Sequence, residues 1–169
     1  LLPISEAQID TWELQATEGG TLGSQTFSDG TRSMGPKKID GDLIMSGGEI
    51  VVTGTLWVTG EIKLSGNSIV RLDADYGGSS AVVMAGIDES ATAGYIEITN
   101  SAKVLGSGST GSHIMLLSQR EMGSNAIKIS NTSAAAILYA GEGQIEISNS
   151  AALKEVTAYK IKISNSATV

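Results

Sequence analysis

The sequence predicts an all-β fold, a right-handed parallel β-helix with three strands per coil and about six coils. Three observations predict it: a repeated heptad, alternating apolar residues inside each copy, and a composition rich in glycine but poor in aromatic residues. The chain has 169 residues, of which 21 are Gly, and its aromatic content is 4%. Glycine suits a chain with many corners, and few aromatics predict a core of Ile, Val, Leu, Met and Ala.

The heptad begins with an apolar, a variable and an apolar residue, followed by Ser or Thr and by Asn or Gly. Its near-copies are IEITNSA (96–102), IKISNTS (127–133), IEISNSA (145–151) and IKISNSA (161–167), with looser copies IKLSGNS (62–68) and LIMSGGE (43–49). Such alternation ending in a turn signal is typical of a short strand and a corner. Two further apolar runs accompany the copies, so each unit holds three strands that only stacking on a neighbour can bury.

The variable residue of each copy is expected to point outward, above its counterpart in the next copy. From the second copy onward these residues alternate in charge: Lys63, Glu97, Lys128, Glu146 and Lys162. Neighbouring strands lie about 4.8 Å apart, so like charges would repel there. The alternation therefore predicts a charge ladder that disfavours slipped registers.

The corner residues predict a second ladder. Its members are Asn100, Asn131, Asn149 and Asn165, with Gly47 and Gly66 in the earlier copies. Asn and Gly both tolerate left-handed backbone, and stacked Asn amides can bond to one another. We interpret this row as structural rather than ligand-binding.

The amino end predicts a capping helix over about residues 6–16, because Ser5 and Gln8 fit a capping box and Ile4 and Ile9 fit a hydrophobic staple. We expect this helix to plug the first coil; membrane association is the alternative. Residues 1–40 then form the cap and a lead-in, and 41–169 form the β-helix, within a single domain. The sequence stops part-way through a coil, so we expect the natural protein to continue or another chain to cover that edge.

Composition excludes several classes of function. Eleven Lys and Arg against 18 Asp and Glu give a net charge of -7, which predicts no nucleic-acid partner. The chain has no Cys and a single His, His113, so it offers no thiolate chemistry and no His pair for a metal. No apolar run is long enough to span a membrane in this fragment, and no cofactor is expected.

Few residues are candidates for chemistry. Asp73 and Asp75 could supply oxygen ligands to calcium, but a solvated turn fits the same residues, and no full calcium motif surrounds them. His113 could be a general base, although a half-exposed residue at a strand edge is the simpler interpretation. The Asp88-Glu89 pair is interpreted as a loop tip. We therefore assign no catalytic residue and no metal site.

With these repeats laid out, the sequence resembles the β-helical ectodomains of bacterial and archaeal cell-surface proteins related to type IV pilus accessory (PilX-like) proteins. The resemblance rests on PISEAQIDTW, GPKKIDGDLIMSGG, VVTGTLWVTGEIKLSGNSIVRLDADYGG and the ISNSA corners. It implies an extracellular, surface-anchored protein with a pilin-like membrane helix that is not among these residues.

The expected function is a non-enzymatic extracellular structural or adhesion module, associated with pili or the envelope. The loops at 73–94 and 106–124 would carry recognition, and the partners would be cell-surface or pilus components, or glycans. One alternative is a carbohydrate-binding or carbohydrate-cleaving β-helix protein. Another is a self-assembling filament subunit that associates end to end.

Overall fold

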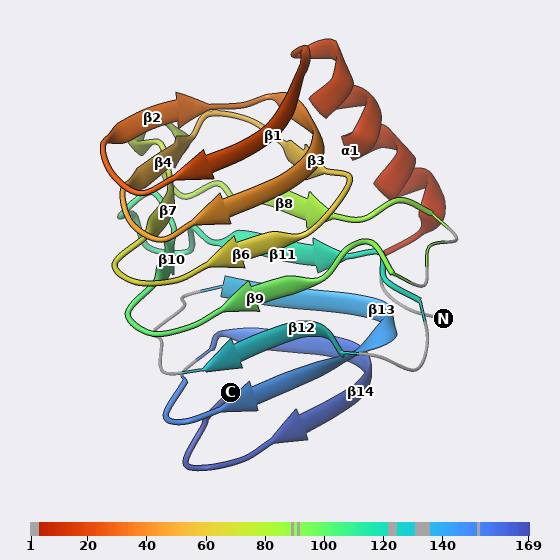
Figure 1. Cartoon of the computed structure of the whole chain (residues 1–169), viewed down its shortest axis with the longest axis vertical. Coiled ribbons are helices and arrows are strands. Elements are labelled where there is room, and N and C mark those ends of the chain that lie inside the picture. Colours follow the sequence, from red (N-terminus) through yellow and green to blue (C-terminus); the bar gives the residue numbers. More distant parts are fainter. Residues whose placement is uncertain (1–3, 89, 91, 122–124, 131–135, 152) are drawn as a thin grey trace.

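The computed structural model of the chain describes residues 4–88, 90, 92–121, 125–130, 136–151 and 153–169. In this part an α-helix, α1 (Glu6–Glu18), comes first and parallel strands follow (Figure 1). The strands are β1 (Thr21–Phe27), β2 (Thr31–Met34), β3 (Lys37–Met45), β4 (Glu49–Val52), β5 (Leu56–Val58), β6 (Ile62–Leu64), β7 (Ile69–Leu72), β8 (Ala81–Ala85), β9 (Ile96–Ile98), β10 (Lys103–Leu105), β11 (Ile114–Ser118), β12 (Asn125–Ser130), β13 (Ala136–Ser148) and β14 (Glu155–Ile163), with a 3-10 helix, η1 (Ala74–Tyr76), before β8. Among the described residues, no helix has the length and hydropathy of a membrane span.

The larger sheet closes on itself. Its strands follow the order β3, β5, β8, β11, β13, β12, β9 and β6, and β6 pairs with β3 again. The predicted three-strand-per-coil β-helix solenoid is therefore wrong: in its hydrogen-bond topology this sheet is an eight-stranded parallel barrel, with β1 and β14 attached to β3 and β13.

The large sheet closes through two long strands, β3 and β13, each of which the sequence pattern divides into two segments. β3 pairs with β5 through its first residues and with β6 through its last, and β13 pairs in the same way with β11 and β12. Gly41, with φ of +130°, lets β3 bend without ending. A glycine that indicated a corner between two segments thus lies at a bend inside one continuous strand.

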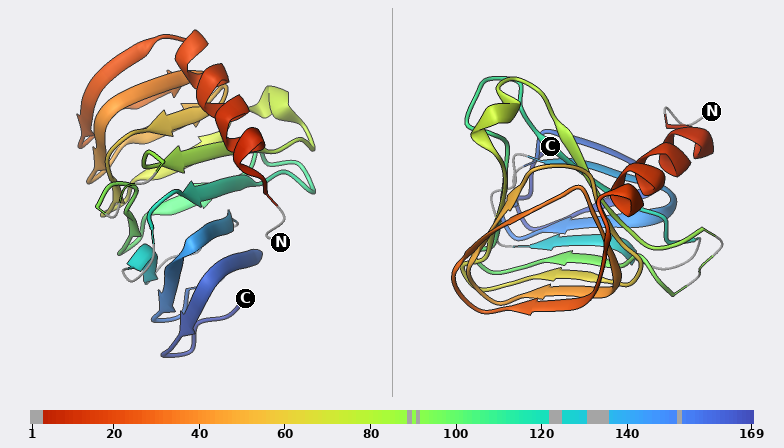
Figure 2. Two further views of the ribbon diagram at one scale, coloured as in Figure 1. Left: turned by 90° about the vertical axis from the view of Figure 1, so that its right-hand side faces the viewer. Right: turned by 90° about the horizontal axis from the view of Figure 1, so that it is seen from above.

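A smaller, separate sheet has four parallel strands in the order β10, β7, β4 and β2. Seen from above, the ribbon has a roughly triangular outline with α1 outside it (Figure 2). Residues 21–40, expected as a lead-in, form β1, β2 and the start of β3, which runs on without a break past residue 40.

The core is a continuous stack of aliphatic side chains. In a strand, alternate residues point to opposite faces, so the apolar residues of the heptads point inward together. Those of four neighbouring strands are all at least 98% buried: Ile62, Leu64, Ile96, Ile98, Ile127, Ile129, Ile145 and Ile147. Each fully buried aliphatic side chain contributes roughly 1.5–3 kcal/mol, so this stack is a main source of stability.

The prediction that the helix plugs the first coil is wrong. The helix lies on the flank of the barrel, outside the ring of strands (Figure 2). Ser5 caps it by accepting a hydrogen bond from the Gln8 N–H, and the buried Ala16 shares its packed face with Ile9 and Trp12. This face covers a strip of outward residues on four strands: Trp57, Val82, Met84, Leu117 and Tyr139. These strands are apolar on both sides, so their outer side also requires a cover.

Candidate functional site

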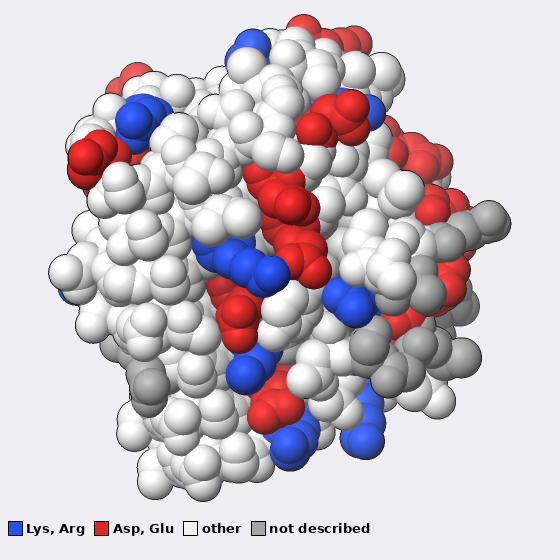
Figure 3. All heavy atoms as spheres, viewed as in Figure 1, with Lys and Arg blue, Asp and Glu red and all other residues white. Residues whose placement is uncertain are grey.

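The five charged residues of the heptads lie in adjacent register positions on β6, β9, β12, β13 and β14. The register pairs Lys63 with Glu97, Glu97 with Lys128, Lys128 with Glu146, and Glu146 with Lys162. Figure 3 shows acidic and basic side chains alternating down this face. We call these five residues the charge row.

Two ion pairs of the charge row are formed directly. Lys128 Nζ lies 3.7 Å from Glu97 Oε1, and Lys162 Nζ lies 3.5 Å from Glu146 Oε1. Pairs as exposed as these contribute about 0.2–1 kcal/mol each. The charge row therefore favours the observed register of the strands and contributes little to the free energy of folding.

Lys63, the first residue of the charge row, also contacts a carboxylate outside the row. Lys63 Nζ lies 2.5 Å from a carboxylate oxygen of Glu61. The pKa of Lys63 is raised, first by the hydrogen bond that its ammonium donates to Glu61 and then by the charges of Glu61 and Glu97. Beside this row, burial raises the pKa of Tyr95 to about 12, and the charge of Glu97 adds to the shift.

The Asn corners adopt left-handed backbone. The φ values are 61° at Asn100, 55° at Asn149 and 53° at Asn165, and Asn165 Nδ2 donates to Asn149 Oδ1 at 3.0 Å. Asn131, expected in the same row, lies outside the described residues.

The two glycines expected in this row differ from each other. Gly66 has φ of 59°, whereas at the first corner Gly48, and not Gly47, has positive φ. The corner there is shifted by one residue. Because a neighbouring Gly follows Gly47, the sequence alone could not decide which of the two takes the left-handed conformation.

Two loops before β8 and β11, residues 73–80 and 106–113, are joined side by side; we call them the paired loops. Three hydrogen bonds link them: Ser107 Oγ to Gly77 O, Ser112 Oγ to Ser79 O (2.8 Å), and the His113 N–H to Ser80 Oγ (3.1 Å). Side chains thus fix one loop against the other, and the exposed residues of both form one surface.

Asp73 and Asp75 lie in the first of the paired loops. Asp73 Oδ1 accepts a hydrogen bond from the Asp75 N–H at 2.9 Å and so caps η1. In the ranges that the structure describes, no three His, Asp or Glu side chains are grouped so that they could hold a metal ion. The geometry of this loop is that of a capped turn.

Tyr76 connects the paired loops to the carboxyl end of α1. It lines an open groove of about 410 Å³ together with Gln15, Glu18, Pro36 and Thr55. Burial raises the pKa of Tyr76, and the nearby charge of Asp73 adds to the shift. The phenol therefore stays protonated and can donate a hydrogen bond at neutral pH.

His113 lies at the base of the paired loops, directly before β11, and is half-buried. Its Nδ1 is buried and has no hydrogen-bond partner among the described residues. A general base needs a group that orients its imidazole. In the part of the chain described, the hydrogen bonds of His113 are made by its backbone, with Ser80 and Ala81.

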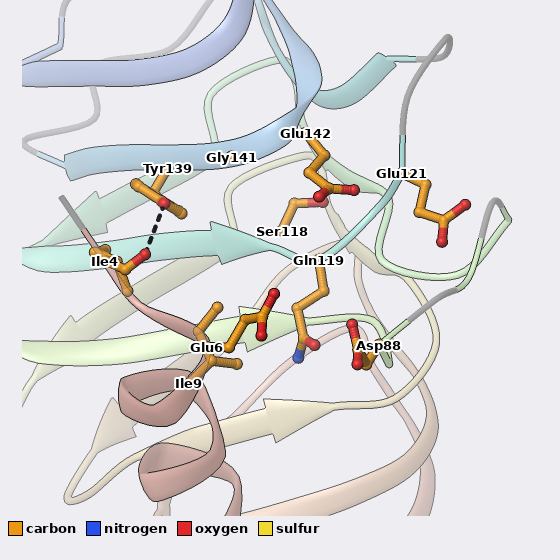
Figure 4. Close-up of a pocket in the computed structure, with 10 residues that line it drawn as sticks. All are labelled: Ile4, Glu6, Ile9, Asp88, Ser118, Gln119, Glu121, Tyr139, Gly141 and Glu142. Atoms are coloured by element: carbon orange, nitrogen blue, oxygen red, sulfur yellow. Dashed lines mark hydrogen bonds between the residues drawn. The ribbon is translucent and has the colours of Figure 1, made fainter. Parts of the chain in front are cut away.

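A second pocket, of about 150 Å³, lies where the start of α1 meets the ends of β8 and β11 and the bend of β13 (Figure 4). Its acidic lining residues are Glu6, Asp88, Glu121 and Glu142. Tyr139, which also lines it, donates a hydrogen bond from its hydroxyl to the Ile4 carbonyl at 3.3 Å. Carboxylates and a phenol in a hollow suit hydrogen bonding to hydroxyl groups or attraction of cations.

Gln119, which lines this acidic pocket, is held in place by Glu13 of α1. Gln119 Nε2 donates to Glu13 Oε1 at 2.8 Å and ties the last residues of the β11 segment to α1. Burial raises the pKa of Glu13, while the hydrogen bond from Gln119 opposes the shift. This pocket could not be predicted from the sequence, since four segments far apart in the chain build it and no motif links them. Asp88 was expected only as a loop tip.

No family model, curated protein or solved structure matches the chain, and so none of these comparisons links it to pilus-associated proteins.

Proposed function

We propose that the protein is a non-enzymatic structural and adhesion module of the cell surface, associated with pili or the envelope. In this proposal the sheets are a rigid support and the paired loops are the recognition surface. The observation that carries it is the set of hydrogen bonds that lock the two loops together, above all that from the buried Ser112 hydroxyl. Loops fixed on a packed support present their side chains in one arrangement, which favours binding.

The chemistry of the paired loops indicates the class of ligand. Their exposed side chains are small and polar, and include Asp75, Ser79, Ser80, Ser109 and Thr110. Hydroxyl and carboxylate groups hydrogen-bond to other hydroxyl groups. Glycans of a cell surface, or glycosylated envelope and pilus components, are therefore the proposed partners.

An array of immobilised glycans and purified pili, probed with the fluorescently labelled full chain, tests this proposal. We expect binding to a subset of spots, and a loss of at least about tenfold when Ser79→Tyr and Thr110→Tyr fill the loop surface. The matched control is Lys128→Gln on the charge row, which should bind like wild type. The proposal would be overturned if the chain bound to no spot, or if the control Lys128→Gln lost as much binding as the two loop variants.

A carbohydrate-cleaving protein is the second candidate, and the acidic pocket is the observation that favours it. Glycoside hydrolysis uses two carboxylates placed on either side of the bond to be broken. Release of reducing sugar from a polysaccharide panel would be compared for Asp88→Asn and Glu142→Gln, with Asp73→Ala and Asp75→Ala as matched variants outside the pocket. Turnover that only the pocket variants abolish would replace the adhesion proposal.

A further inference from the structure

The open groove between the carboxyl end of α1 and the first of the paired loops has a fixed base. Its lining residues come from α1 and from three successive corners, between β2 and β3, β4 and β5, and β7 and β8. Hydrogen bonds join each corner to the next: Thr53 Oγ1 donates to the Gly35 carbonyl at 2.7 Å, and the Asp73 N–H donates to the Val52 carbonyl at 3.0 Å. Seen from above, η1 and α1 stand out from the outline on either side of these corners (Figure 2).

Tyr76 is held in position at one wall of this groove. Its ring is partly buried against the main apolar core, and η1, which ends at Tyr76, is capped by Asp73. The Tyr76 hydroxyl makes no hydrogen bond to any residue in the described ranges. A phenol that is fixed by packing and has no partner of its own can bond to a ligand without first giving up another bond.

The opposite wall of the groove supplies both donors and acceptors. Gln15 Oε1 accepts a hydrogen bond from Thr55 Oγ1 at 3.2 Å, which orients the amide, and the amide nitrogen has no partner in the part of the chain described. Glu18, exposed at the end of α1, adds a carboxylate. A cation requires only acceptors and an anion only donors, whereas a hydroxyl group donates and accepts. The mixed lining therefore favours a ligand with several hydroxyl groups.

The charge around the groove narrows the class of ligand further. Glu18 lines it, and the charge of Asp73 reaches the Tyr76 phenol. Lys37 lies at the same end of α1, where its ammonium donates a hydrogen bond to the Gly19 carbonyl. Two carboxylates thus face one ammonium that is already engaged. Like charges across an interface are unfavourable, so a sugar with a carboxylate or sulfate group is disfavoured.

We propose that this groove binds one neutral pyranose residue of a glycan. The Tyr76 hydroxyl, the Gln15 amide and the Glu18 carboxylate hydrogen-bond to its hydroxyl groups, and the apolar surfaces of Pro36 and the phenol ring contact its C–H groups. The groove volume of about 410 Å³ lies within the range of roughly 300–1,000 Å³ that small-molecule sites occupy. This inference rests on the proposed function, from which it takes the glycan, and adds the place where one sugar unit is recognised.

Titration of the full chain with simple sugars, followed by NMR, tests the inference. The chain contains four Tyr residues, so carbon-13 labelling of tyrosine rings gives few signals, and Tyr76→Phe identifies that of Tyr76. The probes are the methyl pyranosides of glucose, galactose and mannose, with methyl glucuronide as the acidic counterpart. We expect at least one neutral pyranoside to shift the Tyr76 signal saturably and to leave that of the exposed Tyr159 unchanged. The glucuronide should bind about threefold or more weakly.

Two glutamines on one helix supply the variant and its matched control. Gln15→Ala should weaken binding of the neutral pyranoside about threefold or more, because it removes a hydrogen bond to the sugar. Gln8→Ala, which is also exposed on α1 but lies outside the groove, should titrate like wild type. The inference would be overturned by the absence of a saturable Tyr76 shift, by equal binding of the glucuronide, or by unchanged binding in Gln15→Ala.

Thr110→Tyr, in the second of the paired loops, separates this inference from the adhesion proposal. It should lower binding to the glycan array and leave the titration at Tyr76 unchanged. An array that responds to Thr110→Tyr, while no pyranoside shifts the Tyr76 signal, would refute the sugar site in the groove alone. A silent array together with the expected titration would refute the adhesion proposal and support the sugar site.

Discussion

Asn165 donates a hydrogen bond from its side-chain amide to Oδ1 of Asn149 across 3.0 Å, and both residues have left-handed backbone. Two separate effects therefore favour Asn at this corner. Asn tolerates the left-handed backbone, and its side chain bonds to the Asn of the next corner. A non-glycine residue without a polar side chain pays about 1–2 kcal/mol for this backbone conformation.

We expect Asn149→Ala to lower the free energy of unfolding by about 1–2 kcal/mol, because it combines this strain with the lost hydrogen bond. Asn149→Gly should cost less than half as much, because glycine removes the strain and leaves only the lost bond. Urea denaturation of the three proteins measures the difference. Equal losses in both variants would show that backbone conformation is not what selects Asn here.

Gly54 provides a test of close packing without backbone strain. A Cβ atom there would lie 2.4 Å from Pro36 N and 2.9 Å from Gly35 C, both of them backbone atoms. We expect Gly54→Ala to cost about 2 kcal/mol or more, since neither contact can yield by a side-chain rotation. The matched control is Gly23→Ala, where nothing lies within 4 Å of the added Cβ; it should change stability by less than about 0.5 kcal/mol. Thermal unfolding that ranks the two variants the other way would contradict this packing.

The sequence predicts the strands well because their residues alternate with period two. Ile96, Glu97 and Ile98, for instance, point inward, outward and inward without regard to distant parts of the chain. The charge order follows for the same reason, since an outward residue meets its counterpart on the next strand. Local patterns were therefore sufficient for the register of the charge row.

The sequence could not predict which outward sides are covered. In β8, Val82, Val83 and Met84 are all apolar, and the pattern does not indicate that the outer two face α1. Nor do residues as distant as Glu6 and Glu142 carry a signal that they line one pocket. Closure of the large sheet was missed as well, because a corner residue such as Gly41 gives the same signal whether the strand bends or ends.

Glu13 makes stability depend on pH in an unusual direction. Burial raises its pKa above the value in the unfolded chain, so the folded state holds the proton more tightly. The contribution of Glu13 is thus fully present below the unfolded pKa and is lost as the pH rises through the folded pKa. Between pH 4 and pH 7, the Tm of wild type should therefore fall relative to that of Glu13→Gln.

Glu18→Gln, an exposed position at the end of the same helix, is the control for this measurement. Its Tm difference from wild type should not follow the same course with pH. If the difference between wild type and Glu13→Gln were flat, or grew in favour of wild type as the pH rose, burial of the Glu13 carboxyl would not be what governs its proton.

The position of α1 can be tested with two acidic substitutions on one helix. Ala16 is fully buried against the strip that contains Trp57 and Tyr139, whereas Leu14 is 61% exposed. A carboxylate at residue 16 cannot be buried without a partner, so the helix must leave the strip. We expect Ala16→Glu to lower stability by more than about 2 kcal/mol, to shift the tryptophan emission of the folded protein to longer wavelength and to increase binding of an apolar dye. Leu14→Glu should do none of these.

A red shift equal in both variants would mean that α1 does not cover this side of the barrel. Only removal of α1 from the strip exposes Trp57 while the strands remain paired.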